Sequence, residues 1–362
     1  MTAGLYRTAR FRAMNTDVEA VWLEEGPAAG KNGEAAAPGP GDTDDGGSCG
    51  LRAAGQADAP EPERLAADIA DWFAYVEQTC SRFLPDSGLA RLNRSGPGPA
   101  LVSPALLEVL TLADRARRWT NGCFEPFILP ALETAGYDVS FERLAEREEA
   151  APAEQVARPA PSAAACPLLR LDPAVGAAAK APEARLDLGG LAKGWAVDRL
   201  AVWLKGRGVR RGLINAGGDL AVWGAAEEEP WLLDVAAPAG PEERIAVIRL
   251  TEGAAATSSI RRRSWRKGGE AMHHLIDPRT GRSAASDVVQ CTVIGSRAAD
   301  CEVWAKTMCI AGREEGTVLL EGKAPELLAL LALADGRLVL AGSGSRRSAV
   351  HFLRQQERRE DL

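Results

Sequence analysis

Residues 185–200 bring together a carboxylate, two glycines and a lysine at a point where a helix is expected to begin. Asp187 ends a short apolar run, Gly189 and Gly190 follow it, and Lys193 lies in the first turn of the expected helix. Glycines let the backbone approach a ligand closely, and the unpaired N–H groups of a helix N-terminus favour a phosphate. The spacing matches neither the dinucleotide fingerprint nor the Walker loop. A phosphate site and a structural turn are both consistent with these residues.

A second candidate for chemistry is the segment HHLIDPRTG at residues 273–281. His273 and His274 are two of only three histidines in the chain, and an Asp-Pro turn and an Arg-Thr-Gly follow them. An imidazole titrates near neutral pH, so it can act as a general base beside a carboxylate and a guanidinium that binds an anion. A strand end with a rigid turn and a structural Asp–Arg pair explains the same residues equally well.

The elements that must position these residues are predicted from hydrophobic periodicity and from helix-start and turn signals. A first strand is expected over 13–23, with Met14 and Thr16 at its head. The runs LLRLD and ARLDL predict a hairpin that leads into Asp187, and GLINAGGDLAVWG at 212–224 predicts strand, turn and strand. The remaining expected elements are helices that start at Pro62, Ser103 and Gly190, a helix over 298–311, a second helix after it, strands at 231–235, 244–250 and 288–295, and a C-terminal hairpin.

Strand pairs joined by short glycine turns predict a single α+β domain with largely antiparallel sheets and helices packed against them. This domain is expected to cover residues 1–344. Within it, residues 24–61 and 143–166 are rich in Ala, Pro, Gly and acidic side chains, so they are predicted to be disordered low-complexity insertions. Residues 345–362 are predicted to form a charged C-terminal tail.

The composition excludes several classes of protein. The 362 residues are 46% hydrophobic and 26% charged, which supplies a sizeable core. A net charge of −7 argues against a protein that binds nucleic acid through phosphate contacts. No apolar run approaches the roughly 20 residues of a membrane span, and the first 30 residues lack a signal-peptide pattern, so a cytoplasmic location is expected. Seven cysteines without a CxxC pair indicate reduced packing residues.

A group of basic residues has two possible roles. It either guides an acidic cofactor or partner, or forms a solvated loop, and the solvated loop is the favoured interpretation. The group consists of Arg261, Arg262, Arg263, Arg266 and Lys267.

Taken together, these motifs resemble the FAD:protein FMN transferase family, also called the ApbE family. Seven segments match the family pattern in the same order, between residues 13 and 312. Seven motifs in register are far more specific than any one of them, and the resemblance omits only the two insertions and about the last 50 residues. The matching segments are MNT, SRFLPDS, GCFEPF, DLGGLAKGWAVD, NAGGD, ATSS and HLIDPRTG.

The resemblance implies a reaction in which FAD is split at its pyrophosphate and FMN is joined to a Thr or Ser hydroxyl of an acceptor protein, with release of AMP. Some members of the family hydrolyse FAD instead, or in addition. At matching positions, His274 is the implied base. The implied FAD contacts are Met14, Phe83, Cys123, Phe124, Glu125, Asp187, Lys193 and Ile276.

The family holds Mg²⁺ through a main-chain carbonyl, here that of Gly190, and through an Asp and a Thr on its last helix. This chain departs from that pattern, because Glu302 stands at the Asp position and Lys306 at the Thr position. A lysine ammonium has only donors and cannot ligate a cation while charged. Either Lys306 replaces the metal as a catalytic positive charge paired with Glu302, or Asp300 and Glu302 hold Mg²⁺ in a shifted geometry. A plain surface pair is the third possibility.

Smaller departures are Phe83 at a Tyr position, Asn15 at a Gly position and Ser259 at the Gly of ATSG. Phe83 keeps the ability to stack on a ring and loses a hydroxyl. Three hypotheses follow: an FMN transferase acting on a protein acceptor, an FAD-binding or FAD-hydrolysing protein of the same fold without transfer, and a non-catalytic flavin-binding module. The first is preferred.

Overall fold

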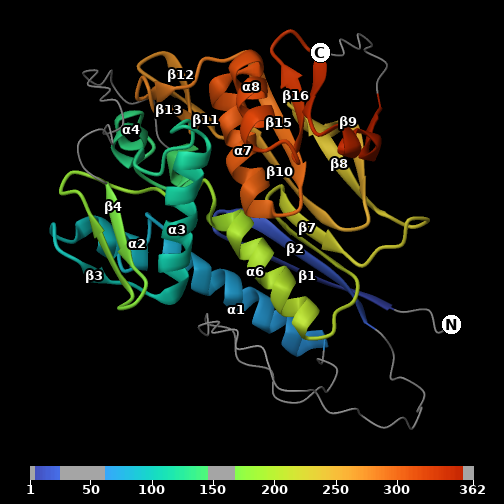
Figure 1. Cartoon of the computed structure of the whole chain (residues 1–362), viewed down its shortest axis with the longest axis horizontal. Coiled ribbons are helices and arrows are strands. Elements are labelled where there is room, and N and C mark those ends of the chain that lie inside the picture. The colour runs from blue at the N-terminus through green and yellow to red at the C-terminus, as the bar shows by residue number, and fades with distance from the viewer. Residues whose placement is uncertain (1–4, 25–61, 146–167, 354–362) are drawn as a thin grey trace.

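The computed structural model describes residues 5–24, 62–145 and 168–353, and an eight-stranded sheet forms its centre (Figure 1). Every neighbouring pair in this sheet is antiparallel. This confirms the α+β class and the largely antiparallel sheet expected from the glycine turns. In spatial order the strands are β1 (Leu5–Ala13), β2 (Thr16–Glu24), β6 (Gly212–Ala216), β7 (Asp219–Trp223), β10 (Gly253–Ser259), β15 (Val288–Gly295), β16 (Leu328–Leu333) and β17 (Leu338–Gly342).

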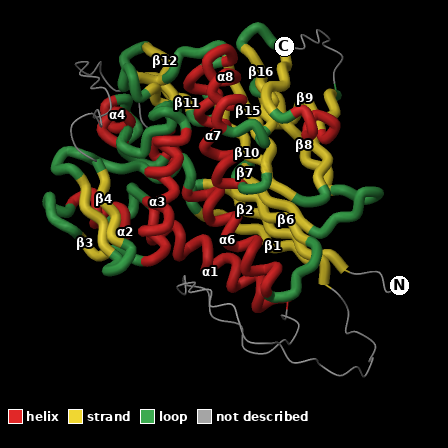
Figure 2. The backbone as a smooth tube through the Cα atoms, viewed as in Figure 1, coloured by secondary structure: helices red, strands yellow, loops and turns green. Residues whose placement is uncertain are grey.

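Helices cover one face of this sheet, as Figure 2 shows in red. Their apolar stripes form the main core together with the inward residues of the strands. Trp72 and Trp195 meet here with ring centroids 5.5 Å apart, and Trp72 Nε1 donates to the carbonyl of Ala196 at 3.0 Å. The covering helices are α1 (Pro62–Cys80), α6 (Ala192–Gly206), α7 (Ala298–Ala311) and α8 (Arg313–Lys323).

A smaller sheet packs on the opposite face, with the strand order β18-β9-β8. The last strand of the chain, β18, follows a short 3₁₀ helix, η1 (Gly344–Ala349), and pairs with β9. Val350 of β18 is buried in the apolar core between this small sheet and the main sheet. The prediction of a tail from residue 345 is therefore wrong for 345–353, and 354–362 lie outside the described residues. The strands are β8 (Trp231–Ala237), β9 (Gly240–Leu250) and β18 (Val350–Phe352).

Short elements gather at one side of the main sheet, and a few of their residues, among them Leu132 and Ile276, line the site described below (Figure 1). They belong to two stretches of chain that are far apart in sequence. The first stretch contributes α2 (Gly88–Arg94), β3 (Ala100–Leu101), α3 (Pro104–Trp119), α4 (Leu129–Thr134), α5 (Phe141–Ala145), β4 (Leu169–Asp172) and β5 (Ala177–Lys180). The second contributes β11 (Ser264–Lys267), β12 (Glu270–His273), β13 (Ile276–Asp277) and β14 (Arg282–Ser283).

One expected strand and one expected hairpin differ from the structure. Residues 13–23 do not form one strand, because Met14 and Asn15 both have positive φ and make a tight turn between β1 and β2. The strand β4 pairs with β5 and not with residues 184–188, which belong to no strand. The apolar alternation identified β4 correctly but could not identify its partner.

The insertion boundaries shift slightly. Residues 25–61 and 146–167 lie outside the described residues, so the disorder expected there stays a prediction. Residues 143–145 belong to α5, where Leu144 is buried against the cluster that contains Tyr137 and Ile276. Among the described helices, none has the length and apolar character needed to cross a membrane.

Candidate functional site

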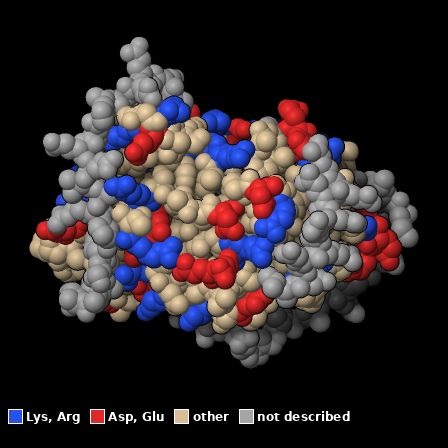
Figure 3. Space-filling model, turned by 90° about the horizontal axis from the view of Figure 1, so that it is seen from above, with Lys and Arg blue, Asp and Glu red and all other residues tan. Residues whose placement is uncertain are grey.

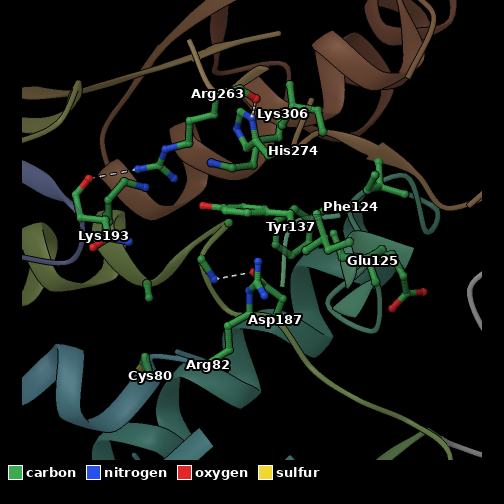
Figure 4. A pocket seen from close by; sticks show the side chains of 18 of the residues that line it. Cys80, Arg82, Phe124, Glu125, Tyr137, Asp187, Lys193, Arg263, His274 and Lys306 are labelled. Carbon is green, nitrogen blue, oxygen red and sulfur yellow. Dashed lines mark hydrogen bonds and ion pairs between the residues drawn. The ribbon is translucent and has the colours of Figure 1, made fainter. Parts of the chain in front are cut away.

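A cavity lies where the loop after α1, the start of α6, the end of β12 and helix α7 meet (Figure 4). All eight residues that the resemblance implies as FAD contacts line it, and so do Gly190, His274 and Lys306. Segments that are remote in the sequence therefore line one cavity, as expected if the matching motifs form a single site. Glu302 and Asp300 are not among the lining residues.

The turn between β1 and β2 forms one edge of the cavity. Met14 and Asn15 adopt φ values of 51° and 56°, a conformation that costs non-glycine residues energy and persists only where the surroundings fix it. The NAGGD turn supports it, since Gly217 N donates to Asp17 O at 3.1 Å. A Cβ on Gly217 would lie 2.0 Å from Thr16 Oγ1, so this close approach requires glycine.

Asp187 organises the floor of the cavity. Its Oδ1 accepts a hydrogen bond from Gly189 N at 2.8 Å, which shapes the glycine turn, and its Oδ2 pairs with Arg82 Nε at 2.6 Å. The guanidinium of Arg82 also lies 4.1 Å from the ring centroid of Phe83. Arg82 Nη2 is buried and has no hydrogen-bond partner among the described residues. A buried donor without a partner is costly, so this atom is available to a ligand.

Aromatic side chains form a second wall. Phe83 and Tyr137 have ring centroids 5.7 Å apart, and Tyr137 and Trp265 have centroids 5.4 Å apart. Figure 4 shows the Tyr137 phenol extending across the cavity toward Lys193 and Arg263. Burial raises the pKa of Tyr137, so its hydroxyl remains a neutral donor and acceptor at neutral pH. The wall suits a planar ring system with polar groups at its edge.

Glu125 and Cys123 line the cavity but direct their polar atoms elsewhere. The carboxylate of Glu125 pairs with Arg117 Nε at 2.6 Å and accepts from Phe127 N at 3.2 Å, and Figure 4 shows it pointing away from the cavity. Burial raises the pKa of Cys123 to about 12, which keeps it a neutral thiol. These two residues therefore offer shape and apolar contact to a ligand rather than charge.

Four charged side chains, three of them buried and Lys306 half-buried, form a cluster beneath the glycine turn, and we call them the charge cluster: Lys193, Asp219, Glu302 and Lys306. Lys193 Nζ lies 2.8 Å from Asp219 Oδ2 and 2.5 Å from Glu302 Oε1. Lys306 Nζ lies 3.0 Å from the same Glu302 oxygen. Asp219 comes directly after the NAGGD glycines, so that turn also delivers a carboxylate to the cluster.

The pKa values within the charge cluster follow from burial and from these contacts. Burial alone would raise the pKa of Glu302, but Lys193 and Lys306 outweigh it, and the pKa falls to about 2. Burial and the nearby Glu302 raise the pKa of Asp219 to about 6. Burial lowers the pKa of Lys306, although Glu302 opposes the shift. At neutral pH Glu302 is a fixed negative charge held between two ammonium groups.

His274 faces the cavity next to Lys306 and Arg263. Its Nδ1 lies 3.4 Å from the carbonyl of Arg263. Burial, followed by the charges of Arg263 and Lys306, lowers the pKa of His274 well below its usual value, so the imidazole is neutral at pH 7. A neutral imidazole has a free nitrogen lone pair and can accept a proton.

The basic group divides into two parts. Arg263 lines the cavity and its Nη2 lies 3.5 Å from Asn15 O, so the prediction of a solvated loop is wrong for this residue. Arg261 and Arg262 are exposed, whereas Lys267 Nζ donates to Thr134 O at 2.5 Å. On the face seen in Figure 3, basic and acidic side chains are interspersed.

Among the cavity residues that the sequence did not single out as site residues, three bear on the chemistry of the site: Arg82, Tyr137 and Arg263. Arg82 lies within the SRFLPDS motif, and its neighbour Phe83 was selected instead. Tyr137 is one of only three tyrosines and follows Gly136, which has a φ of 97°. An aromatic residue after a glycine at the end of a helix was the available signal.

The chain is similar to proteins of known family. The sequence model of the ApbE family matches residues 46–331. A FAD:protein FMN transferase of Treponema pallidum is 25% identical over 309 residues, which cover 80% of this chain and 83% of that protein. One from Vibrio cholerae is 24% identical over 279 residues, which cover 76% of this chain and 82% of that protein.

Solved structures agree in fold. The flavin transferase ApbE from Vibrio cholerae superposes with a TM-score of 0.71 at 20% identity, over 96% of this chain and 99% of that structure. The ApbE protein of Thermotoga maritima superposes with a TM-score of 0.72 at 21% identity, over 95% and 99%.

Proposed function

Because this chain belongs to the ApbE family, we propose that it transfers FMN from FAD to a Thr or Ser hydroxyl of an acceptor protein. The acceptor oxygen forms a bond to the phosphorus of the FMN half, and the bond from that phosphorus to the bridging pyrophosphate oxygen breaks. AMP leaves with the bridging oxygen, and the hydroxyl proton passes to a base. FAD is the substrate of this reaction.

One observation carries the proposal: a neutral histidine, a set of cations and an aromatic wall face the same cavity. Phosphoryl transfer requires a base near the nucleophile and positive charge near the phosphate oxygens. His274 supports the first requirement, and Arg263 and Lys306 support the second. Phe83 and Tyr137 offer stacking surfaces for the flavin ring.

We assign His274 the role of the base that takes the acceptor proton. Its depressed pKa keeps the lone pair available at neutral and mildly acidic pH. Arg263 and Lys306 keep the pKa low by charge repulsion, and the same two groups are suited to bind the pyrophosphate. An anion between them and the imidazole would relieve this repulsion, so bound FAD is expected to raise the basicity of His274.

The remaining cavity residues are assigned to FAD binding. The buried Nη2 of Arg82 offers a hydrogen bond to a carbonyl or phosphate oxygen. Asp187 positions Arg82 and the glycine turn, and Gly190 must stay small because a Cβ there would lie 2.9 Å from Phe124. Met14, Cys123 and Ile276 contribute apolar lining.

The test is to incubate the full chain with FAD and a peptide that contains Asp-Gly-x-Thr-Gly-Ala-Thr. Mass spectrometry detects the flavin-labelled peptide, and chromatography detects AMP. Label together with AMP supports transfer, whereas AMP without label supports FAD hydrolysis, the alternative that the Lys306 substitution suggests. A peptide with Ala in place of each Thr must remain unlabelled. Absence of both products in every buffer would refute the proposed function.

His274→Ala is expected to lower the transfer rate by about 10²- to 10⁴-fold. FAD affinity should stay within a few-fold of the wild type, because the imidazole acts on the acceptor hydroxyl. His351→Ala is the matched control, since His351 is exposed on β18 and is absent from the cavity lining. Unchanged labelling by His274→Ala would show that another group is the base.

A further inference from the structure

Within the charge cluster, Lys306 lies between the glycine turn and Glu302. Its side chain is 12% exposed, and its Cδ would lie 3.5 Å from a Cβ on Gly190, so its stem packs against the turn. The ammonium nitrogen of Lys306 lies 3.0 Å from Glu302 Oε1. Lys306 Nζ donates to Glu302 Oε1 and Lys306 also lines the cavity, and an ammonium has three donors in all, so it can bind a ligand oxygen as well as Glu302.

The oxygens of Glu302 are already engaged. Oε1 accepts from Lys193 and Lys306, and Oε2 accepts from the backbone N–H of Gly194 at 2.8 Å. Glu302 is fully buried behind the two lysines, so a cation in the cavity would have to displace Lys306 to reach it. A carboxylate in this environment is a partner for ammonium groups rather than a free metal ligand.

The neighbouring oxygen donors of α7 do not offer a replacement. Asp300 Oδ1 pairs with Arg115 Nη2 at 2.5 Å, outside the cavity lining. The hydroxyl of Thr307 donates to Val303 O at 2.9 Å and is fully buried. Within the described part of the chain, no group of three or more His, Cys, Asp or Glu side chains is arranged to hold a metal ion.

These residues do not fit Mg²⁺. Magnesium requires near-octahedral oxygen ligands at about 2.0–2.1 Å. The charge cluster instead presents an ammonium to the cavity where such ligands would be needed, and its two carboxylates are already paired with the two lysines. We propose that this chain neutralises the FAD pyrophosphate with the ammonium of Lys306 in place of a divalent cation, and that Glu302, itself fixed by Lys193 and the Gly194 N–H, holds this ammonium in position. This inference rests on the proposed function, because it concerns the same substrate.

The first experiment measures FAD affinity of the wild type from flavin fluorescence, in EDTA and in excess Mg²⁺. The dissociation constants are expected to agree within about twofold, because no metal takes part in binding. Transfer to the peptide, measured in parallel, is expected to proceed equally in both buffers. A tenfold or greater loss of FAD affinity in EDTA would overturn the proposal.

The second experiment compares Lys306→Met with Lys306→Arg and with the control Lys205→Met. Met removes the charge and keeps most of the volume, so FAD affinity is expected to fall by about 10- to 100-fold. Arg keeps the charge and should recover part of that loss. Lys205 pairs with Glu252 away from the cavity, and its replacement should leave affinity unchanged.

These outcomes separate the two proposals. If neither labelled peptide nor AMP forms, the proposed function fails, while the FAD titrations still decide the role of Lys306. If Lys306→Met binds FAD as tightly as the wild type, the inference is overturned even when transfer is observed. A thermal unfolding curve for each variant confirms that the measured chain is folded.

Discussion

Two carboxylates, one fully buried and one half-buried, join helices α6 and α7 in a reciprocal way. Glu302 of α7 accepts from the Gly194 N–H in the first turn of α6, at 2.8 Å. Asp198 of α6 accepts from the N–H groups of Ala298 and Ala299 in the first turn of α7, at 2.7 and 3.0 Å. Each helix therefore supplies an acceptor for the unsatisfied donors of the other helix.

The two carboxylates differ in the direction of their pKa shift. Burial raises the pKa of Asp198 to about 6, although two N–H donors oppose the shift. The pKa of Glu302 falls to about 2, since two ammonium groups outweigh burial. At Asp198, two peptide N–H donors and the more distant Arg297, whose Nε lies 4.0 Å away, do not offset desolvation, whereas two ammonium groups in direct contact do so at Glu302.

This difference separates a structural role from a functional one. Asp198 lies outside the cavity lining, and its carboxylate connects α6 to the backbone of α7. Glu302 connects the same helices and also holds Lys193 and Lys306, which line the cavity. The two helices approach each other so closely that a Cβ on Gly194 would lie 2.7 Å from the backbone of Ala298. A close helix contact thus brings the charge cluster to the substrate.

The largest expected effect comes from Glu302→Gln. The change keeps the side-chain volume and removes the charge between two lysines, so the free energy of unfolding should fall by about 3–5 kcal/mol. Urea unfolding at neutral pH, followed by circular dichroism, measures it. A loss below about 1 kcal/mol would show that the lysines find other partners. FAD affinity should fall as well, because Lys306 loses its support.

A smaller effect is expected from Asp198→Ala. Removal of this acceptor leaves two N–H groups at the start of α7 unsatisfied, which should cost about 0.5–2 kcal/mol of unfolding free energy. FAD affinity should remain at the wild-type value, since α7 keeps its contacts with the sheet and Glu302 keeps its lysines. If Asp198→Ala weakened FAD binding as strongly as Glu302→Gln, the distinction between the two carboxylates would be broken.

Much of this arrangement could be predicted from the sequence. Apolar periodicity located α6 and α7, and glycine pairs located the β6–β7 turn, because these features depend on local chemistry. The motif order indicated that Gly190, His274 and the helix of Lys306 share one site, which the cavity lining supports. Lys306 stood out because an ammonium is chemically incompatible with a metal-ligand position.

The remainder depends on tertiary contacts that local patterns do not encode. The pairing of β18 with β9 and of β4 with β5 follows from which apolar faces remain uncovered after folding. Arg263 and Arg262 are adjacent in a basic run, yet only Arg263 lines the cavity. The reciprocal roles of Asp198 and Glu302 depend on the crossing of two helices that are about a hundred residues apart.

The smallest expected effect is a pH dependence of the free energy of unfolding, which should differ between Asp198 and Glu302. The folded-state pKa of Asp198, about 6, lies above its usual value, so its contribution to stability is present at low pH and is lost as pH rises through 6. The contribution of Glu302 to stability changes with pH in the opposite direction. Because its pKa is lowered on folding, this contribution is lost as pH falls from about 4.5 toward 2. Between pH 5 and 7 the contribution of Glu302 is therefore nearly constant.

Asp198→Asn isolates this contribution, because Asn keeps an acceptor oxygen and does not titrate. The free energy of unfolding of the wild type minus that of Asp198→Asn should be about 1 kcal/mol larger at pH 5 than at pH 7. Urea unfolding of both proteins at the two pH values measures the difference. A pH-independent difference would mean that the N–H donors of Ala298 and Ala299 hold Asp198 ionised, and the two carboxylates would then be alike in charge despite their different partners.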